Sequence, residues 1–280
     1  MEKKIKLLAI DLDGTLLNSK GQISKQDKDI LRKFYEKGGI VVLASGRMTD
    51  CVSIYSKILK IDTPLIVYNG AMVRLREKEK RKIIYHKPVP LKYSKFLIDY
   101  CIKNKFFLNF YYNDVLYAQK SPYLKKYAEI YSSQTGAKYN FIDNLKIMED
   151  KKPTKLILIT DVKNPVKERT RDYQYSYFKK IFGKFLNIVK TNPEYLEFMN
   201  KGVSKGKALR EIAKYYGIRR DEIIAFGDGE NDIDMLIYAK ISVVPKNCIE
   251  KVKKFATIVS DYTNDESYIS KFLKGFIKND

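Results

Sequence analysis

The sequence predicts an α/β protein whose core is a doubly wound, Rossmann-like parallel sheet, with an α+β cap domain inserted into it. Three observations lead to this fold class. Several apolar runs of strand length are almost continuously hydrophobic, which is typical of parallel strands covered on both faces. Helical patterns alternate with these runs, and the middle of the chain departs from the alternation.

The core elements follow one another as strand and helix in both outer parts of the chain. Each predicted strand ends in small, polar or acidic residues. Each predicted helix places apolar residues on one side, as Ile30, Leu31 and Phe34 do in the first. Right-handed crossovers are expected between the parallel strands. The predicted strands are residues 6–11, 39–44, 64–68, 222–226 and 240–244, and the predicted helices are residues 24–37, 48–59, 204–216 and 233–238.

The middle of the chain has the pattern of an α+β insertion. Asn113 and Asp114 form the predicted turn of a hairpin there. Predicted helices cover residues 91–103, 123–132 and 165–182, and predicted strands cover residues 106–112, 115–118, 155–160 and 185–189. The change of pattern assigns residues 1–83 and 189–280 to the core and residues 84–188 to the cap.

Charge composition restricts the partners that we expect. The 280 residues contain 54 Lys and Arg against 33 Asp and Glu, a formal net charge of +21. The Lys residues are scattered, and no basic run alternates with aromatic residues, so a nucleic-acid partner is not expected. The Lys-rich residues 74–82 have the pattern of a solvated hairpin. The basicity suits solubility or the attraction of small anionic substrates.

Apolar runs and cysteines restrict the location. No run approaches the ~20 apolar residues that a membrane span needs, and residues 1–6 lead directly into the first predicted strand without a signal-peptide pattern. The cysteines Cys51, Cys101 and Cys248 lack the spacing of a disulfide framework or a zinc site. We therefore expect a cytoplasmic protein, and the sequence leaves its oligomeric state open.

Polar clusters follow the first two predicted strands, at the edge where open α/β sheets bind ligands. Asp11 and Asp13 stand two residues apart, so both aim to one side, and Gly14 permits a tight turn after them. Such a pair also occurs in ordinary turns. Ser45 and the following Gly-Arg offer a hydroxyl and backbone N–H groups to an anion, although Ser45 is equally suited to cap a helix.

A third cluster, Gly-Asp-Gly-Glu-Asn-Asp at residues 227–232, follows the predicted strand 222–226. It is not an EF-hand loop, because Ile233 and Ala239 occupy the positions that would need Gly and Glu. Carboxylates that gather at neighbouring strand ends repel one another, so such a site is stable only with a cation or with raised pKa values of the carboxyl groups. Oxygen donors without His or Cys point to Mg²⁺, and Lys205 can supply a further positive charge.

Together these motifs resemble the haloacid dehalogenase (HAD) superfamily of phosphotransferases. The resemblance rests on Asp-Leu-Asp-Gly-Thr-Leu at residues 11–16, then Ser45, Lys205 and Gly-Asp-x-x-Asn-Asp at residues 227–232, in that order. More narrowly, Ser-Gly-Arg, Asn69-Gly-Ala and Gly-Val-Ser-Lys-Gly resemble the Cof-type hydrolases with a large α/β cap, class IIB-like. The predicted insertion lies where that cap belongs.

The resemblance implies a role for each matched residue. Asp11 is the nucleophile, and an aspartate carboxylate needs no base because it is ionised at pH 7. Asp13 is the general acid and base, and its carbonyl joins the carboxylates of Asp11 and Asp228 as Mg²⁺ ligands. Asp232 assists catalysis by orienting Lys205 or the metal waters. The groups that bind the phosphoryl oxygens or the substrate are Leu12, Ser45, Gly46, Arg47, Lys205 and Asn231.

The resulting prediction is a Mg²⁺-dependent phosphatase that hydrolyses small phosphate monoesters, such as sugar phosphates, through an aspartyl-phosphate. The alternative is a non-catalytic phosphometabolite sensor or nucleic-acid-binding protein on the same fold. A mutase would need a second phosphate site that the sequence does not supply. His86, the single histidine, is interpreted as a cap or hinge residue without a catalytic role.

Some segments depart from the family pattern or leave two roles open. Residues 244–248 (Val-Pro-Lys-Asn-Cys) replace the Ala-Met-Gly-Asn-Ala-like turn of many Cof-type sequences, although Asn247 keeps its place. Residues 263–266 follow the pattern only in part and are interpreted as a helix cap. Several cap tyrosines suit either a substrate pocket or ordinary packing, namely Tyr111, Tyr112, Tyr117, Tyr123 and Tyr127.

Overall fold

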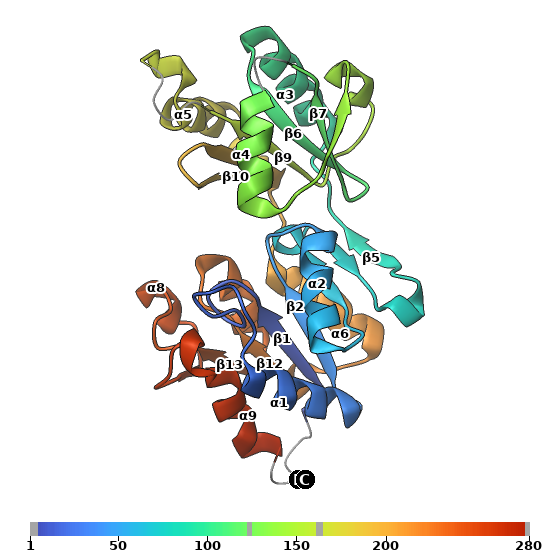
Figure 1. Cartoon of the computed structure of the whole chain (residues 1–280), viewed down its shortest axis with the longest axis vertical. Coiled ribbons are helices and arrows are strands. Elements are labelled where there is room, and N and C mark those ends of the chain that lie inside the picture. Colours follow the sequence, from blue (N-terminus) through green and yellow to red (C-terminus); the bar gives the residue numbers. More distant parts are fainter. Residues whose placement is uncertain (1–4, 122–124, 161–164, 278–280) are drawn as a thin grey trace. The chain divides into compact units, whose positions relative to one another are not determined.

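The computed structural model describes residues 5–121, 125–160 and 165–277. The chain divides into two compact units, one formed by Met1–His86 with Ser204–Asp280 and the other by Lys87–Val203 (Figure 1). The first unit contains the sheet predicted for the core, and the second is the inserted cap. The cap unit ends at Val203, beyond the boundary predicted at residue 188.

The core unit is built on an eight-stranded sheet in the order β14-β13-β12-β1-β2-β3-β4-β5. Neighbours from β14 to β3 are parallel, and the chain winds outward from β1 in both directions, so the doubly wound parallel core is confirmed. All five predicted strands are present, with ends shifted by at most one residue. The strands are β1 (Leu7–Asp11), β2 (Ile40–Ala44), β3 (Leu65–Val67), β4 (Met72–Arg74), β5 (Ile83–His86), β12 (Ile223–Phe226), β13 (Ile241–Val244) and β14 (Ile258–Val259).

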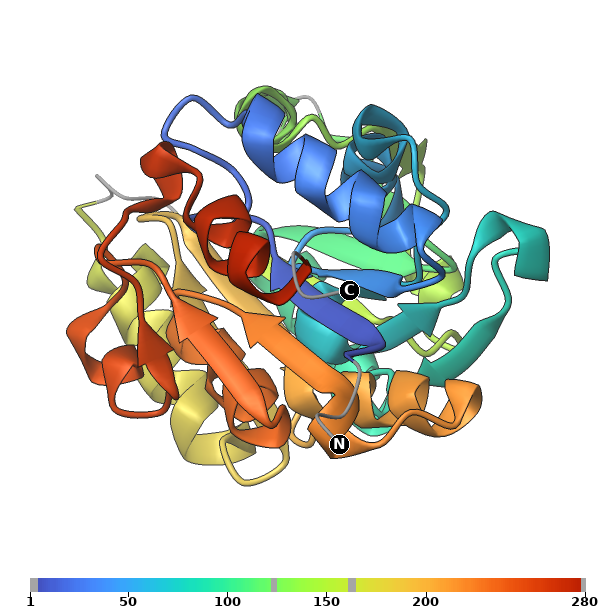
Figure 2. The ribbon, with the colours of Figure 1, turned by 90° about the horizontal axis from the view of Figure 1, so that it is seen from below.

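Helices cover both faces of the core sheet (Figure 2). Leu209 and Leu236, from α6 and α7, pack with the alternate residues Leu7 and Ala9 of β1 on one face. The helices α1 and α9 pack against each other on the other face. With both faces covered, every residue of β1 is buried. The helices are α1 (Lys25–Glu36), α2 (Thr49–Leu59), α6 (Lys205–Tyr216), α7 (Ile233–Tyr238), α8 (Glu250–Lys253) and α9 (Tyr268–Ile277).

The Lys-rich residues 74–82 connect the antiparallel strands β4 and β5, as the predicted hairpin requires. Its tip is more firmly attached than a solvated hairpin would be. Arg76 forms two hydrogen bonds to Glu79, at 3.1 and 3.2 Å, and its guanidinium lies over the ring of Tyr216. The hydroxyl of Tyr216 donates to the same carboxylate at 2.6 Å. These contacts hold the hairpin against the end of α6.

The cap is a six-stranded mixed sheet in the order β10-β11-β9-β6-β7-β8, so the predicted α+β insertion is confirmed. Strand β11, which the sequence patterns did not predict, lies between β10 and β9 and pairs with both. Because β11 belongs to this sheet, the cap continues past residue 188. The strands are β6 (Phe107–Tyr112), β7 (Val115–Gln119), β8 (Tyr139–Ile142), β9 (Lys155–Ile159), β10 (Leu186–Thr191) and β11 (Tyr195–Asn200).

The cap helices are α3 (Leu91–Asn104), α4 (Lys125–Thr135) and α5 (Arg171–Phe182). The predicted start of the second helix, residue 123, lies outside the described residues. Helix α5 begins later than the predicted residue 165, because the hydroxyl of Thr170 caps it by accepting the N–H of Tyr173.

Alternate residues of β6 face the two sides of the cap sheet. Leu108 and Phe110 pack into the apolar cluster that includes Phe178 of α5. Tyr111 is buried, and its hydroxyl hydrogen-bonds the hydroxyl of Tyr131 in α4 at 2.5 Å. The described structure therefore assigns Tyr111 to packing, one of the two roles that the sequence left open, whereas Tyr123 lies outside the described residues.

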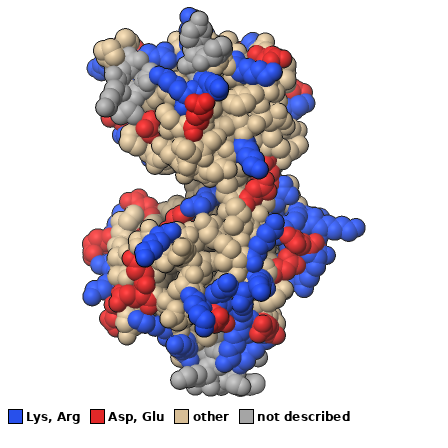
Figure 3. Space-filling model, viewed as in Figure 1, with Lys and Arg blue, Asp and Glu red and all other residues tan. Residues whose placement is uncertain are grey.

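Charged side chains are spread over the surface of both units. On the face shown in Figure 3, Lys and Arg are interspersed with Asp and Glu, in agreement with the scattering of Lys along the sequence. Among the described residues, no helix combines the length and the apolar character that crossing a membrane requires.

Candidate active site

Asp11 stands at the carboxyl end of the central strand β1. It is registered with Ala44, so Ser45 follows at the same edge of the sheet. The chain then turns sharply, and Gly14 has a φ of +81°, which an L side chain rarely adopts. A Cβ at Gly14 would also overlap the carboxylate of Asp228. The glycine therefore lets the turn after β1 approach the loop after β12.

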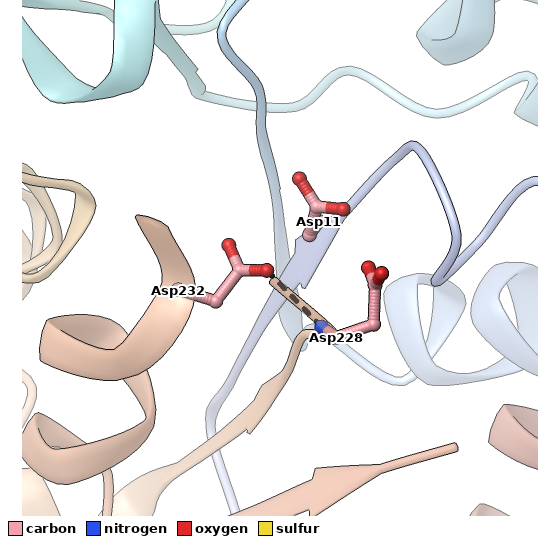
Figure 4. Close-up of side chains that lie close together, drawn as sticks. All are labelled: Asp11, Asp228 and Asp232. Atoms are coloured by element: carbon pink, nitrogen blue, oxygen red, sulfur yellow. Dashed lines mark hydrogen bonds between the residues drawn. The ribbon is translucent and has the colours of Figure 1, made fainter. Parts of the chain in front are cut away.

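Asp228 and Asp232 come from the loop that follows β12, and Figure 4 shows both with Asp11. Asp232 holds its own loop together, because its Oδ2 accepts the N–H of Asp228 at 3.1 Å and of Gly229 at 3.0 Å. The hydroxyl of Thr15 donates to Oδ1 of Asp228 at 2.7 Å. The turn after β1 and the loop after β12 are thus joined at a carboxylate.

Lys205 is the first residue of α6 and is completely buried. Its Nζ lies 2.5 Å from Oδ1 of Asp11 and 2.7 Å from Oδ1 of Asp232. A buried ammonium is retained only with such partners. The helix dipole disfavours a cation at a helix start, so the two carboxylates account for its position.

Two glycines let the start of α6 reach this position. Gly70 has a φ of +92°, and a Cβ there would overlap the backbone of Ser204. A Cβ at Gly206 would overlap the carbonyl of Asp234. Ser204 caps the helix by accepting the N–H of Lys207 at 3.2 Å. The helix start is therefore fixed by close backbone contacts on two sides.

The cluster carries an excess of negative charge. Ionised Asp11, Asp228 and Asp232 with one ammonium, Lys205, have a formal charge of −2. Burial raises the pKa of Asp11, the charge of Asp232 raises it further, and Lys205 opposes both effects. Burial also raises the pKa of Asp228, while the bond from Thr15 opposes this. Burial lowers the pKa of Lys205, but the carboxylates outweigh it and raise the pKa above its ordinary value, so the ammonium stays protonated.

The residues present fit a divalent cation. One oxygen from each of Asp11, Asp228 and Asp232 lies within 4.8 Å of the others. A charge of +2 would cancel the formal charge of the cluster, and an all-oxygen donor set suits a hard cation. Asp232 already accepts bonds from Lys205 and two backbone amides. Asp11 and Asp228 are therefore the better ligands.

Asp13 lies apart from the buried cluster. Its side chain is 55% exposed, and Arg47 binds both of its oxygens, Oδ1 at 2.5 Å and Oδ2 at 3.0 Å. The remaining branch of Arg47 donates to the hydroxyl of Tyr55 at 3.2 Å. The structure brings these two predicted residues together as a bidentate ion pair, and it adds Tyr55, which the sequence patterns did not indicate.

The predicted phosphoryl-binding residues lie around the loop after β2. The N–H of Arg47 donates to the hydroxyl of Ser45 at 3.2 Å. Asn231 donates from Nδ2 to Oδ1 of Asn69 at 3.0 Å, and a Cβ at Gly46 would lie 3.0 Å from the same oxygen. Asn69 has a φ of +54°. The amide of Asn69 thus connects the loop after β2 to the loop after β12.

Leu12 and Thr15 complete the site. The side chain of Leu12 is fully buried, and its carbonyl accepts the N–H of Thr15 and of Leu17. Any contact of Leu12 with a ligand must therefore come from its backbone N–H. Thr15 was not predicted as a site residue, although it belongs to the motif at residues 11–16 and its hydroxyl binds Asp228. The sequence signal for Thr15 was a hydroxyl four residues after Asp11.

Comparison with known proteins extends these observations. A family model described as haloacid dehalogenase-like hydrolase matches residues 8–273. The 5-amino-6-(5-phospho-D-ribitylamino)uracil phosphatase YitU of Bacillus subtilis is 29% identical over 282 residues, which cover 99% of each chain. Among solved structures, TM0651 from Thermotoga maritima superposes with a TM-score of 0.87 and 33% identity over 97% of both chains.

A second solved structure has a more specific description. The HAD subclass IIB sugar phosphatase BT4131 superposes with a TM-score of 0.76 and 25% identity, over 97% of this chain and 98% of that one. The similarity to these proteins extends along nearly the whole chain. The chain therefore belongs to the haloacid dehalogenase-like hydrolases, in the Cof-type subclass IIB group, and is a phosphatase of that superfamily.

Proposed function

We propose that the protein hydrolyses small phosphate monoesters, sugar or polyol phosphates above all, in a Mg²⁺-dependent reaction through an aspartyl-phosphate on Asp11. The observation that carries this proposal is the buried Lys205, bonded to both Asp11 and Asp232. An ammonium at this position keeps a buried carboxylate ionised and also offers positive charge to a phosphoryl group beside it.

Asp11 is the nucleophile in this proposal. A carboxylate oxygen of Asp11 attacks phosphorus, the bond between phosphorus and the ester oxygen breaks, and the phosphoryl group becomes attached to Asp11. Lys205 limits the rise in pKa that burial imposes on Asp11. This effect preserves the ionised form that the attack requires. Water then attacks the phosphoryl group, which releases inorganic phosphate and regenerates the carboxylate.

Asp13 handles the proton in both half-reactions. A protonated Asp13 gives its proton to the departing ester oxygen, and the resulting carboxylate takes one from the attacking water. The bidentate contact with Arg47 holds the Asp13 carboxylate at the surface of the core unit. An anionic phosphate ester competes for the same guanidinium, since Arg binds phosphate and carboxylate with similar geometry. Substrate binding at Arg47 would then free Asp13 to act.

The carboxylates of Asp11 and Asp228 would hold Mg²⁺, with the carbonyl of Asp13 as a third ligand implied by the family resemblance. When bound, it supplies positive charge to the phosphoryl oxygens. The hydroxyl of Ser45, the backbone N–H of Gly46 and Leu12 and the amide of Asn231 are the proposed donors to the same oxygens.

The substrate class follows from two relatives. YitU is described as acting on a phosphoribitylamino uracil, and BT4131 is described as a sugar phosphatase. Both kinds of substrate carry a phosphate monoester on a polyhydroxylated chain. We propose that this protein acts on the same class of substrate. We also propose that it does so in the cytoplasm.

The test is phosphate release from a panel of sugar phosphates, ribitol phosphates and nucleotides with Mg²⁺, for the wild type and Asp11→Asn. This substitution preserves shape and removes the charge of the nucleophile, so turnover should disappear while the fold remains. Wild-type turnover that survives in the variant would refute Asp11 as nucleophile. Binding of esters by the wild type without any turnover would instead favour a non-catalytic sensor.

A further inference from the structure

Two asparagines from segments without a role in the proposed reaction lie together in the core unit. Asn247 follows β13, in the segment that departs from the family pattern, and Asn264 precedes α9. Nδ2 of Asn247 donates to Oδ1 of Asn264 at 2.8 Å, and the backbone N–H of Asn264 donates back to Oδ1 of Asn247 at 3.4 Å. The two residues therefore bind each other reciprocally.

The side chain of Asn264 is bonded at both of its ends. While its Oδ1 accepts from Asn247, its Nδ2 donates to the carbonyl of Leu17 at 2.8 Å. Asn264 is 7% exposed and Leu17 is 2% exposed, so the bond is shielded from water. A carboxylate in place of the amide would keep the acceptor and lose the donor. The contact with Leu17 therefore depends on the amide specifically.

Leu17 closes the turn that carries Asp13. Its N–H donates to the carbonyl of Leu12 at 2.8 Å, and it forms an isolated bridge with Asp13. Within the same turn, Thr15 binds Asp228. Holding the carbonyl of Leu17 therefore restrains a short turn that contains both the proposed acid and a partner of the proposed metal ligand.

The segment that contains Asn247 also contacts the loop of Asp228. The N–H of Ile249, two residues after Asn247, donates to the carbonyl of Asp228 at 3.2 Å. The Asn247 segment thus touches the loop of Asp228 directly and the turn of Asp13 through Asn264. The Asn247 segment therefore joins the two loops through these contacts.

We propose that Asn264, fixed by Asn247, is a positioning residue that holds the turn of residues 12–17 so that Asp13 and Asp228 keep their catalytic spacing. This inference rests on the proposed function, in which Asp13 is the acid and base. A helix cap does not account for the contact, because Thr263 and Glu266 form the capping interactions, with Thr263 N–H donating to Glu266 at 2.9 Å. Asn264 binds Leu17 and Asn247 instead.

The test compares Asn264→Asp with Glu266→Ala. The first variant removes the donor to Leu17 with almost no change of shape, and the second removes the capping bond of the same loop without touching Leu17. Asp265→Asn is a further control, since it keeps the oxygen that accepts the N–H of Ser19 at 2.6 Å. Each variant is measured for kcat, KM and melting temperature, and for hydrogen exchange at the amide of Leu17.

For Asn264→Asp we expect kcat to fall by about tenfold or more, with a smaller change in KM, because a misplaced catalytic group slows the chemical step. The amide of Leu17 should exchange faster. Glu266→Ala should lower the melting temperature while kcat and the exchange of Leu17 stay as in the wild type. Asp265→Asn should match the wild type in all four measurements.

The inference is overturned if Asn264→Asp keeps the wild-type kcat and the wild-type exchange rate at the amide of Leu17. It is also overturned if Glu266→Ala lowers kcat and speeds this exchange as much as Asn264→Asp does. If Asn264→Asp fails to fold, Asn247→Asp carries the test, because it leaves the bond to Leu17 and removes the donor that fixes Asn264. The exchange measurement does not depend on turnover. An inactive wild type would count against the proposed function, and unchanged exchange at Leu17 would count against this inference.

Discussion

Replacing Lys205 by Met should destabilise the core unit strongly at neutral pH. Methionine fills a similar volume without charge, so the main loss is the counter-charge of Asp11 and Asp232. Lys205 is 0% exposed, and its Nζ lies within 2.7 Å of both carboxylates. Removing one partner of a buried ion pair costs about 3–5 kcal/mol of unfolding free energy. We expect a loss in that range.

The pH dependence of this loss has a defined sign. In the variant, burial and Asp232 raise the pKa of Asp11 above its unfolded value without the opposing effect of Lys205. A carboxyl group whose pKa is higher in the folded than in the unfolded state binds more protons in the folded state. It therefore lowers the unfolding free energy as the pH rises through the range between its two pKa values. The difference in unfolding free energy between wild type and variant should therefore narrow as the pH falls toward the pKa of Asp11 in the unfolded chain. Added Mg²⁺ should narrow the same difference at pH 7, because its charge would offset that of the carboxylates.

Urea titrations followed by circular dichroism, at pH 7 and pH 5 and with or without Mg²⁺, measure these differences. The data are fitted with two transitions if the cap unfolds separately. The matched control is Lys251→Met, which removes an exposed ion pair with Glu230 (3.1 Å, side chains 60% and 59% exposed). An exposed pair contributes about 0–1 kcal/mol. If Lys205→Met is as stable as this control at pH 7, the charge argument for the site is refuted.

Three further predictions concern the metal and the loops around it. Excess chelator should stop phosphate release, and added MgCl₂ should restore it; full activity in chelator would remove the metal from the mechanism. Arg47→Lys cannot form the bidentate contact with Asp13, so kcat should fall about tenfold with little change in melting temperature, and unchanged steady-state kinetics would contradict a role for the guanidinium geometry. Gly14→Ala should lower the unfolding free energy by about 1–2 kcal/mol for its positive φ alone, and should weaken Mg²⁺ binding in calorimetry because the new methyl group overlaps the carboxylate of Asp228. Wild-type stability and Mg²⁺ affinity in Gly14→Ala would contradict the close approach of the two loops.

The core of the site was predictable because parallel strands bring their carboxyl ends to one edge. Asp11 ends β1 and Asp228 follows β12, and these strands are neighbours in the sheet. Strand order thus places carboxylates together even though they are far apart in sequence. Lys205 lies 194 residues from Asp11, and the need of the acidic cluster for a further positive charge is what indicated it.

The end of the cap was not predictable in the same way. Strand β11 contains Glu197 and lies beside β10 in an antiparallel hairpin. Its polar residues Glu197 and Asn200 are only partly buried and interrupt its sequence, so it lacked the continuous apolar run by which the core strands were identified. The boundary was therefore drawn at residue 188, where the apolar run of the preceding strand weakens.

The directions of the side chains within the site could not be predicted from sequence patterns either. Asp11 and Asp13 share a strand-end motif, yet Asp11 is buried with Lys205 whereas Asp13 is exposed on Arg47. The difference arises because β1 ends at Asp11, so the two-residue alternation of a strand no longer applies at Asp13.

The same reasoning explains why the role of Asn264 emerged only from the folded chain. Its amide contacts Leu17, 247 residues away, across loops whose meeting is set by neither strand order nor helix periodicity. Burial makes this contact important. When the side-chain amide of Asn264 is removed, water cannot reach the buried carbonyl of Leu17 to replace the lost donor. The turn of residues 12–17 lies outside the strands and helices, so its position depends on such contacts. Residues that hold it should therefore affect kcat even though they touch neither substrate nor metal.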